Sequence, residues 1–295
     1  MKNAIAIGNF DGVHLGHRAL IRSNGEGTDL RRMVLTFTPH PRMVMKDPDF
    51  RMIYSEEKKI RLLKETGLID ELVLLPFDEA QMNQSAEDFF YHILLEKYQA
   101  GMICVGDNFR FGRKAMADVS DLKKLCEKNG VICRILPRVT RNRVPVSSSR
   151  IRRLLEEGTI SKAHELLGRS YTIDGFVHTG KHVGTTMHTP TINLPLEEGT
   201  VDPRHGVYIS EIELDGRKYD GISNVGINPT FGGESPRIET FIFDFDEMIY
   251  GAEVKVKPLH FIREERKFKD PQELRAQIAL DIEEAKRIFS LKKGI

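Results

Sequence analysis

The chain has 295 residues, of which 40% are hydrophobic and 29% are charged, and its formal net charge is +1. A charge this close to balance argues against a strongly basic surface, so we expect no nucleic-acid partner. No apolar run reaches the ~18 residues of a membrane-spanning helix and no signal peptide is recognisable, so we expect a cytoplasmic protein with no membrane partner. The length favours two domains.

The three cysteines point to the same compartment. Cys104, Cys126 and Cys133 form no Cys-x-x-Cys pair, and their odd number excludes a complete disulfide framework. A reducing compartment and a role as small buried hydrophobes account for them.

The first half of the chain alternates short apolar runs with helical patterns. Ser55 and Ser85 each open a segment with acidic residues in its first turn and apolar residues at helical spacing. Alternation of this kind predicts βαβ units and a parallel sheet. The expected strands cover residues 4–7, 33–37, 71–75, 102–105 and 133–136.

After Gly168 the pattern changes to β-branched and aromatic runs separated by Gly, Pro and Asp, which predicts an antiparallel sheet or small barrel. The Asp215-Gly216 pair indicates a hairpin turn. Helical patterns cover 150–157 and 160–167, between the halves, and 271–289 near the end. The expected strands cover residues 171–178, 207–214, 218–225, 239–245 and 253–261.

The first apolar run leads directly into the sequence GNFDGVHLGH, residues 8–17. Zinc would need a third ligand near His14 and His17, and no Cys/His cluster lies nearby in the sequence. A strand, a Gly-rich turn and a helix beginning near Gly16 would instead place both imidazoles at a helix N-terminus on the carboxyl edge of the sheet, where phosphate binds. Two solvated surface histidines are the alternative.

Four ordered motifs then resemble those of the bacterial two-domain riboflavin kinase/FMN adenylyltransferase family, also called FAD synthetase. The first resembles the His-x-Gly-His signature of nucleotidyltransferases in its flavin-specific form. The motifs read GNFDGVHLGH at 8–17, TFTPHP at 36–41, GDNFRFG at 106–112 and SSSRIR at 147–152.

The resemblance implies an α/β nucleotidyltransferase domain with a Rossmann-like parallel sheet, here residues 1–158. It also implies a mainly β-barrel, riboflavin-kinase-like domain with a terminal helix, here residues 168–295. The implied reaction converts FMN and ATP to FAD and pyrophosphate, with Mg²⁺ carried by ATP.

That reaction needs positioned donors more than a base, because the FMN phosphate is already an anion. By resemblance, His14 and His17 hold the ATP phosphates. Arg150 and Arg152 are the cationic partners, since Arg forks onto phosphate. The residues expected to shape the turn and supply hydroxyl donors are Gly8, Asn9, Phe10, Asp11, Gly12, Ser147, Ser148 and Ser149.

The third motif is the expected flavin side. Asn108 offers an amide, and Phe109 and Phe111 offer flat apolar rings for an isoalloxazine. The alternative is that both rings belong to the hydrophobic core. His40, between two prolines, either lines the flavin pocket or fixes a turn.

In the second half, Thr191 and Asn193 match the family's Pro-Thr-x-Asn, whose Thr and Asn hold Mg²⁺ and nucleotide. Glu239 stands where the family keeps its catalytic Glu, and a neutral riboflavin hydroxyl makes a general base useful. The nucleotide loop keeps Gly180 and Gly184.

Three positions of that loop depart from the family. The family Arg is Thr185, a family Gly is His188, and the family aromatic is Thr189. These changes remove a cation, add bulk and loosen the loop, so we expect the kinase step to be absent or severely weakened. Thr191, Asn193 and Glu239 keep a fully bifunctional enzyme as the alternative.

Other classes of protein explain less of the chain. A nucleotidyltransferase acting on another phosphate would not explain the second half, and a class I aminoacyl-tRNA synthetase would need a Lys-rich second signature. A non-catalytic flavin sensor needs neither the paired histidines nor the Ser-Ser-Ser-Arg run. The expected partners are therefore ATP, FMN and riboflavin, and the sequence indicates no particular oligomeric state.

Overall fold

The computed structural model describes residues 2–177, 191–227, 236–247 and 249–293. The chain forms two compact units, Met1–Arg150 and Ile151–Ile295, and the division falls within helix α7 (Ser148–Glu156).

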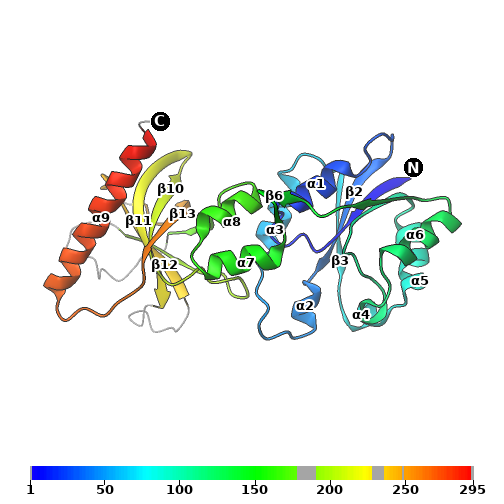
Figure 1. Cartoon of the computed structure of the whole chain (residues 1–295), viewed down its shortest axis with the longest axis horizontal. Coiled ribbons are helices and arrows are strands. Elements are labelled where there is room, and N and C mark those ends of the chain that lie inside the picture. Colours follow the sequence, from blue (N-terminus) through cyan, green and yellow to red (C-terminus); the bar gives the residue numbers. More distant parts are fainter. Residues whose placement is uncertain (1, 178–190, 228–235, 248, 294–295) are drawn as a thin grey trace. The chain divides into compact units, whose positions relative to one another are not determined.

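The first unit is built on a five-stranded sheet in the order β3-β2-β1-β4-β5, and every neighbouring pair is parallel. The predicted parallel sheet is therefore confirmed, with strand ends extended by one or two residues. Its strands are β1 (Asn3–Ile7), β2 (Arg31–Thr38), β3 (Glu71–Pro76), β4 (Ala100–Gly106) and β5 (Ile132–Leu136). Figure 1 labels two of its strands, β2 and β3.

Helices cover both faces of this sheet, which explains why its strands read as continuous apolar runs. Ala4 and Ala6 of β1 face α1 (Leu15–Ser23) and α3 (Glu56–Lys64), whereas Ile5 and Ile7 face the opposite side. That side is covered by the π-helix η1 (Phe89–Lys97) and by α6 (Val119–Lys128).

The helix starts expected from the sequence are present. Ser55 caps α3 by accepting from the amide of Lys58, and Ser85 caps α5 (Ala86–Asp88), which runs into η1. Short elements complete the unit: α2 (Pro41–Val44), α4 (Glu79–Asn83), η2 (Arg113–Ala115), β6 (Thr140–Arg141) and β7 (Val144–Pro145).

The second unit contains α7, α8 (Ile160–Leu167) and a six-stranded antiparallel sheet in the order β8-β13-β10-β11-β12-β9. Its edge strands approach each other: a Cβ added at Gly175 of β8 would lie 3.2 Å from the Leu194 side chain of β9. The sheet therefore nearly closes into the expected barrel. Its strands are β8 (Ile173–Phe176), β9 (Thr191–Pro195), β10 (Gly206–Leu214), β11 (Arg217–Ile227), β12 (Pro236–Ile242) and β13 (Glu253–Arg263).

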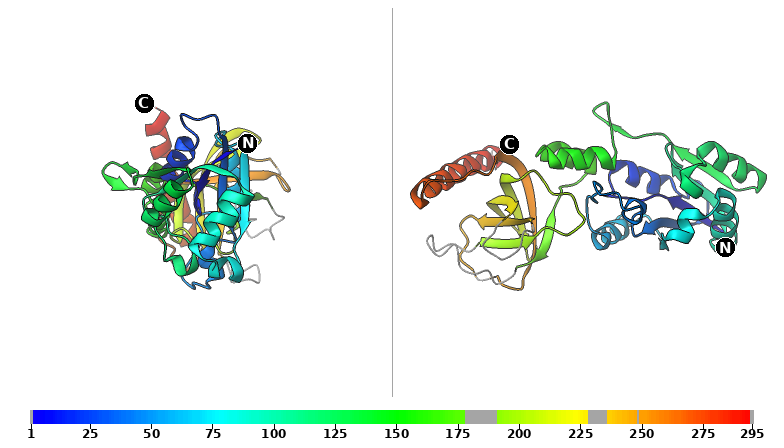
Figure 2. Two further views of the ribbon diagram at one scale, coloured as in Figure 1. Left: turned by 90° about the vertical axis from the view of Figure 1, so that its right-hand side faces the viewer. Right: turned by 90° about the horizontal axis from the view of Figure 1, so that it is seen from below.

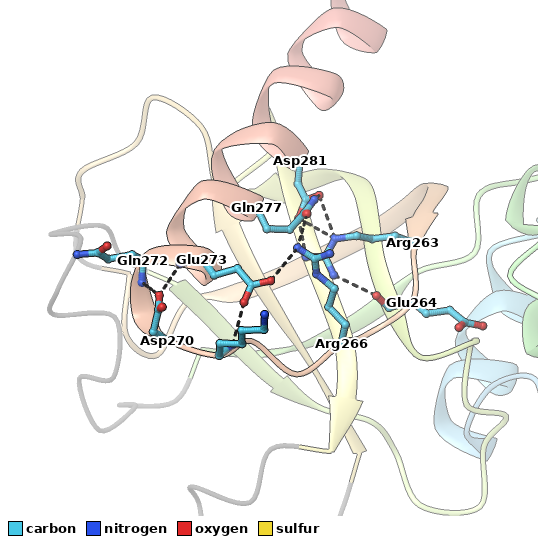
Figure 3. A network of polar contacts seen from close by, with 9 residues as sticks. Arg263, Glu264, Arg266, Asp270, Gln272, Glu273, Gln277 and Asp281 are labelled. Carbon is cyan, nitrogen blue, oxygen red and sulfur yellow. Dashed lines mark hydrogen bonds and ion pairs between the residues drawn. The ribbon is translucent and has the colours of Figure 1, made fainter.

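The long helix α9 (Pro271–Lys293) lies along the outer face of this sheet (Figure 2). Ala285 and Phe289 of the helix pack against Ile209 and Ile222 of the strands. An ion pair joins the end of β13 to the helix, since Arg263 donates to the buried carboxylate of Asp281 with Nη2 and Oδ2 2.7 Å apart (Figure 3).

Candidate functional site

The carboxyl edge of the parallel sheet gathers three of the four sequence motifs. The loop 8–17 leaves β1, the segment 39–41 leaves β2, and the segment 107–112 leaves β4. The chain connects β1 to β2 on one side while β4 lies on the other, so this edge contains the switch point of the strand order. Crevices at such points are where open α/β sheets bind ligands.

The loop after β1 has an unusual backbone. Phe10, Gly12 and Val13 all have positive φ, at 52°, 79° and 40°. Glycine is needed at position 12 for two reasons: its φ favours glycine, and a Cβ there would lie 2.6 Å from Cδ1 of Ile53. Val13 is β-branched, and such residues rarely adopt positive φ outside strained, functional turns.

This backbone places the two histidines at the N-terminus of α1. His14 is the N-cap, and its Nδ1 accepts from the backbone amide of His17 at 3.2 Å. The two rings stack with centroids 3.6 Å apart and an interplanar angle of 12°, and the edge of Phe10 contacts His17 at 5.3 Å. The imidazoles are thus fixed side by side where the helix dipole favours an anion.

The fourth motif reaches the same loop through Ser148. Its Oγ donates to the backbone carbonyl of Asp11 at 2.9 Å. Ser147 accepts from the amide of Arg150 at 3.3 Å and so caps the start of α7. Ser149 is exposed, and Arg152 follows on the same helix.

The three candidate flavin residues of the segment after β4 differ in how deeply they are buried. Phe111 is a core residue, 6% exposed and packed near Phe89. Phe109 stacks on Phe111 with centroids 5.5 Å apart and remains half-buried, while Asn108 is exposed. Phe109 is therefore the ring with surface left for a ligand.

His40 has a definite local role. Its Nδ1 accepts from the amide of Arg42 at 3.2 Å, which caps α2, and its ring stacks on Phe50 at 4.4 Å. Fixing this turn explains its burial, and flavin contact by His40 stays a prediction.

Two residues of this edge escaped the sequence reasoning. Thr36 is fully buried, and its Oγ1 donates to the carbonyl of Asn9 at 3.2 Å, which ties β2 to the first motif. Lys59 of α3 is a buried cation, 1% exposed, whose Nζ donates to the carbonyl of Phe37 at 3.1 Å. Thr36 could have been identified from its place within the second motif. Lys59 could not, because in the sequence it looks like any other charged residue of a surface helix.

In the second unit, a polar row crosses three strands. Glu239 of β12 pairs in register with Asn193 of β9 on one side and with Asn224 of β11 on the other. Directly paired residues of antiparallel strands share a face of the sheet. Arg237 donates to Oδ1 of Asn193 at 3.4 Å. Burial raises the pKa of Glu239, and the charge of Arg237 opposes that rise.

Thr191 begins β9 and is exposed. The loop residues Gly180, Gly184, Thr185, His188 and Thr189 lie outside the described residues.

Within the described ranges, no group of three or more His, Cys, Asp or Glu side chains is arranged to hold a metal ion. The oxygen donors of Thr191 and Asn193 are of the type Mg²⁺ prefers, and Mg²⁺ is commonly bound by one or two protein groups together with substrate phosphates. The residues present therefore fit an ion that arrives with the nucleotide. No helix in the described parts of the chain is both long and apolar enough to cross a membrane.

Comparison with known proteins identifies both units. Residues 1–150 match the family described as FAD synthetase, and residues 167–289 match the family described as riboflavin kinase. The bifunctional riboflavin kinase/FMN adenylyltransferase of Bacillus subtilis is 35% identical, with 98% of this chain and 93% of that protein covered. The protein of the same name from Escherichia coli K12 is 33% identical, with coverages of 98% and 93%.

A crystal structure gives the same picture for the fold. A protein from Streptococcus pneumoniae, described as a macrolide-efflux protein, superposes with a TM-score of 0.84 at 32% identity. The match covers 97% of this chain and 94% of that one.

Proposed function

The chain belongs to the bifunctional riboflavin kinase/FMN adenylyltransferase family, and on this premise we propose that residues 1–158 transfer AMP from ATP to FMN, releasing pyrophosphate and FAD. One observation carries the proposal: His14 and His17 stack at the N-terminus of α1, on a loop that Ser148 joins to the start of α7. Donors from two helix starts thereby converge on one place where polyphosphate can bind.

The reaction requires electrostatic stabilisation of the charge that develops on the phosphate oxygens. An oxygen of the FMN phosphate attacks the α-phosphorus of ATP in line, the bond to the β-phosphate bridging oxygen breaks, and the electron pair leaves with pyrophosphate. The nucleophile is an anion, so the protein need not remove a proton. The imidazoles of His14 and His17 would donate to the oxygens on which charge grows, and preorganised donors of this kind supply much of the rate.

The remaining residues have supporting roles in this proposal. Ser149 and Arg150 would contact phosphate oxygens from the start of α7, and Arg152 would add a second permanent charge. Asn108 and the half-buried ring of Phe109 would contact the isoalloxazine, with His40 holding the neighbouring turn. Mg²⁺ bound to ATP would neutralise phosphate charge.

For residues 168–295 we propose a riboflavin kinase step that is much slower than adenylyl transfer. Glu239 lies in register between Asn193 and Asn224, which supports a general base kept in place. The losses fall on the nucleotide loop, where Thr185 removes a cation and His188 adds a ring in place of glycine. The defect should therefore appear mainly as weak ATP binding, with a raised KM for ATP.

The test is chromatographic product analysis of the full chain with Mg²⁺ and ATP, using FMN in one reaction and riboflavin in another. The proposal predicts rapid FAD formation from FMN and little FMN from riboflavin. The triple variant Thr185→Arg, His188→Gly and Thr189→Phe should recover part of the kinase activity. Robust FMN formation by the unaltered chain, at a rate comparable with adenylyl transfer, would overturn the kinase proposal and leave the adenylyltransferase proposal standing.

A further inference from the structure

The loop that carries the two histidines needs outside support. Phe10 and Val13 both have positive φ, a conformation that is strained for non-glycine residues and persists only where surrounding structure enforces it. The α1 helix begins directly after this segment, so the shape of the loop decides where the rings of His14 and His17 lie.

Asp11, in the middle of the loop, is hydrogen-bonded to two other segments of the unit. The residue is 2% exposed. Its carboxylate Oδ1 accepts from the amide of Ile53 at 2.9 Å, and its backbone carbonyl accepts from Ser148 at 2.9 Å. Asp11 thus connects the loop to the segment before α3 and to the start of α7.

Lys59 of α3 is a buried cation whose charge interacts with that of Asp11. Burial lowers the pKa of Lys59, while the negative charges of Glu56 and Asp11 oppose that effect. Glu56 in turn accepts from the hydroxyl of Thr38, the last residue of β2. Burying an ammonium costs free energy unless it is paired and hydrogen-bonded. The partners of Lys59 are Asp11 of the loop after β1, the carbonyl of Phe37 in β2, and Glu56 of its own helix.

We propose that Lys59 is a positioning residue for adenylyl transfer: its ammonium holds the Asp11 carboxylate and the carboxyl end of β2 together, and so fixes the loop that aims His14 and His17. The inference rests on the proposed adenylyltransferase function. Lys59 is too deeply buried to meet substrate, so its effect passes through Asp11 and Phe37.

The test compares Lys59→Met with Lys58→Met. Methionine preserves much of the apolar length and removes the charge. Lys58 is a matched control, since it is the adjacent buried lysine of the same helix and lies 4.3 Å over the ring of Tyr54. At a temperature where all proteins are folded, Lys59→Met should lower kcat/KM for ATP at least tenfold, and Lys58→Met should stay within twofold of the unaltered chain. Lys59→Arg, which keeps the charge, should recover part of the loss.

Two further readouts do not depend on turnover. Calorimetric binding of Mg²⁺ with α,β-methylene-ATP should weaken at least tenfold in Lys59→Met. The imidazole nitrogen NMR signals of His14 and His17 should move in Lys59→Met and stay in place in Lys58→Met.

Each outcome decides the matter. Unchanged ATP kinetics and unchanged imidazole signals in a destabilised Lys59→Met protein would show a merely structural lysine and overturn the inference. If Lys59→Met does not fold, the double variant Glu56→Gln/Lys59→Met is used instead, because it also removes a carboxylate that would be left without its cation. Its control is the single variant Glu56→Gln, and the same criteria apply. If the unaltered chain makes no FAD, the proposed function fails, and the imidazole signals still decide the role of Lys59.

Discussion

Ser148 and Asp11, 137 residues apart in the sequence, meet in a hydrogen bond of 2.9 Å between the serine hydroxyl and the aspartate backbone carbonyl. The contact joins the start of α7 to the loop after β1. It makes the first and fourth motifs parts of one surface, which neither motif could show alone.

Removing this bond should affect both stability and activity. Ser148→Ala leaves the backbone carbonyl of the buried Asp11 without this donor, so we expect a loss of about 1 kcal/mol in the free energy of unfolding. We also expect slower adenylyl transfer, because the loop is less well fixed. Thermal unfolding and FAD formation are measured beside Ser120→Ala, an exposed serine of α6. Equal behaviour of the two variants would argue against a linking role for Ser148.

The histidines should prove essential for reasons beyond capping. His14→Ala or His17→Ala should lower the rate of FAD formation by roughly 10²-fold or more, the scale for removing one preorganised donor. His14→Ala also loses the helix cap, worth about 1 kcal/mol for good capping side chains. His14→Asn restores a capping side chain without an imidazole, so it should regain stability and remain slow. Near-normal turnover in His14→Asn would mean that His14 serves only as a cap.

Sequence reasoning reached the order of the secondary structure because burial leaves a strong pattern. All five parallel strands were predicted, since a strand covered on both faces reads as an apolar run. The hairpin at Asp215 and Gly216 followed from turn chemistry, and both residues do have positive φ, at 48° and 74°.

Three elements of the structure differ from the prediction, each for a physical reason. The predicted strand 239–245 ends at Ile242, and Phe243 turns its ring toward α9, because hydrophobic composition alone does not show where pairing stops. The short strand β9 was not predicted, since its pattern became visible only through pairing with β12. The π-helix η1 stands where an ordinary helix was expected, because one helical period resembles the other in sequence.

Some residues of the site could be predicted from sequence motifs and others could not. The motifs identified loops and helix starts, and the sheet topology then brought three of them to one edge. Lys59 could not be found from sequence, because its partners Asp11 and Phe37 are distant in the chain and a lysine in a helix usually faces solvent.

The cysteines give a prediction that is independent of turnover. A hydrogen bond from the thiol of Cys126 and the charge of Lys123 lower the pKa of Cys133, whereas burial raises the pKa of Cys104 to about 11. A lowered pKa means that thiolate forms at lower pH, so iodoacetamide should label Cys133 first as pH rises. Peptide mass spectrometry across a pH series measures this order. Earlier labelling of Cys104 would contradict it, and Lys123→Ala should slow labelling of Cys133.

The residual kinase step should follow the protonation of Glu239. Burial raises the pKa of this carboxyl, so the basic form is lost as pH falls through a value above that of an ordinary glutamate. FMN formation from riboflavin should therefore decline on the acid side, and Arg237→Gln should shift that decline to higher pH. Glu239→Gln should abolish FMN formation while leaving FAD formation from FMN unchanged. An acid limb that does not respond to Arg237→Gln would assign the base elsewhere.

The central claim, adenylyl transfer by the first unit, is tested most directly by following the phosphorus atoms of ATP. The full chain is incubated with Mg²⁺, FMN and ATP labelled either at the α- or at the γ-phosphate, with oxidised and with reduced flavin. The account predicts α-label in FAD and γ-label in pyrophosphate, with both appearing roughly 10²-fold more slowly in His14→Asn. Folded protein that places no α-label in FAD with either form of the flavin would contradict it.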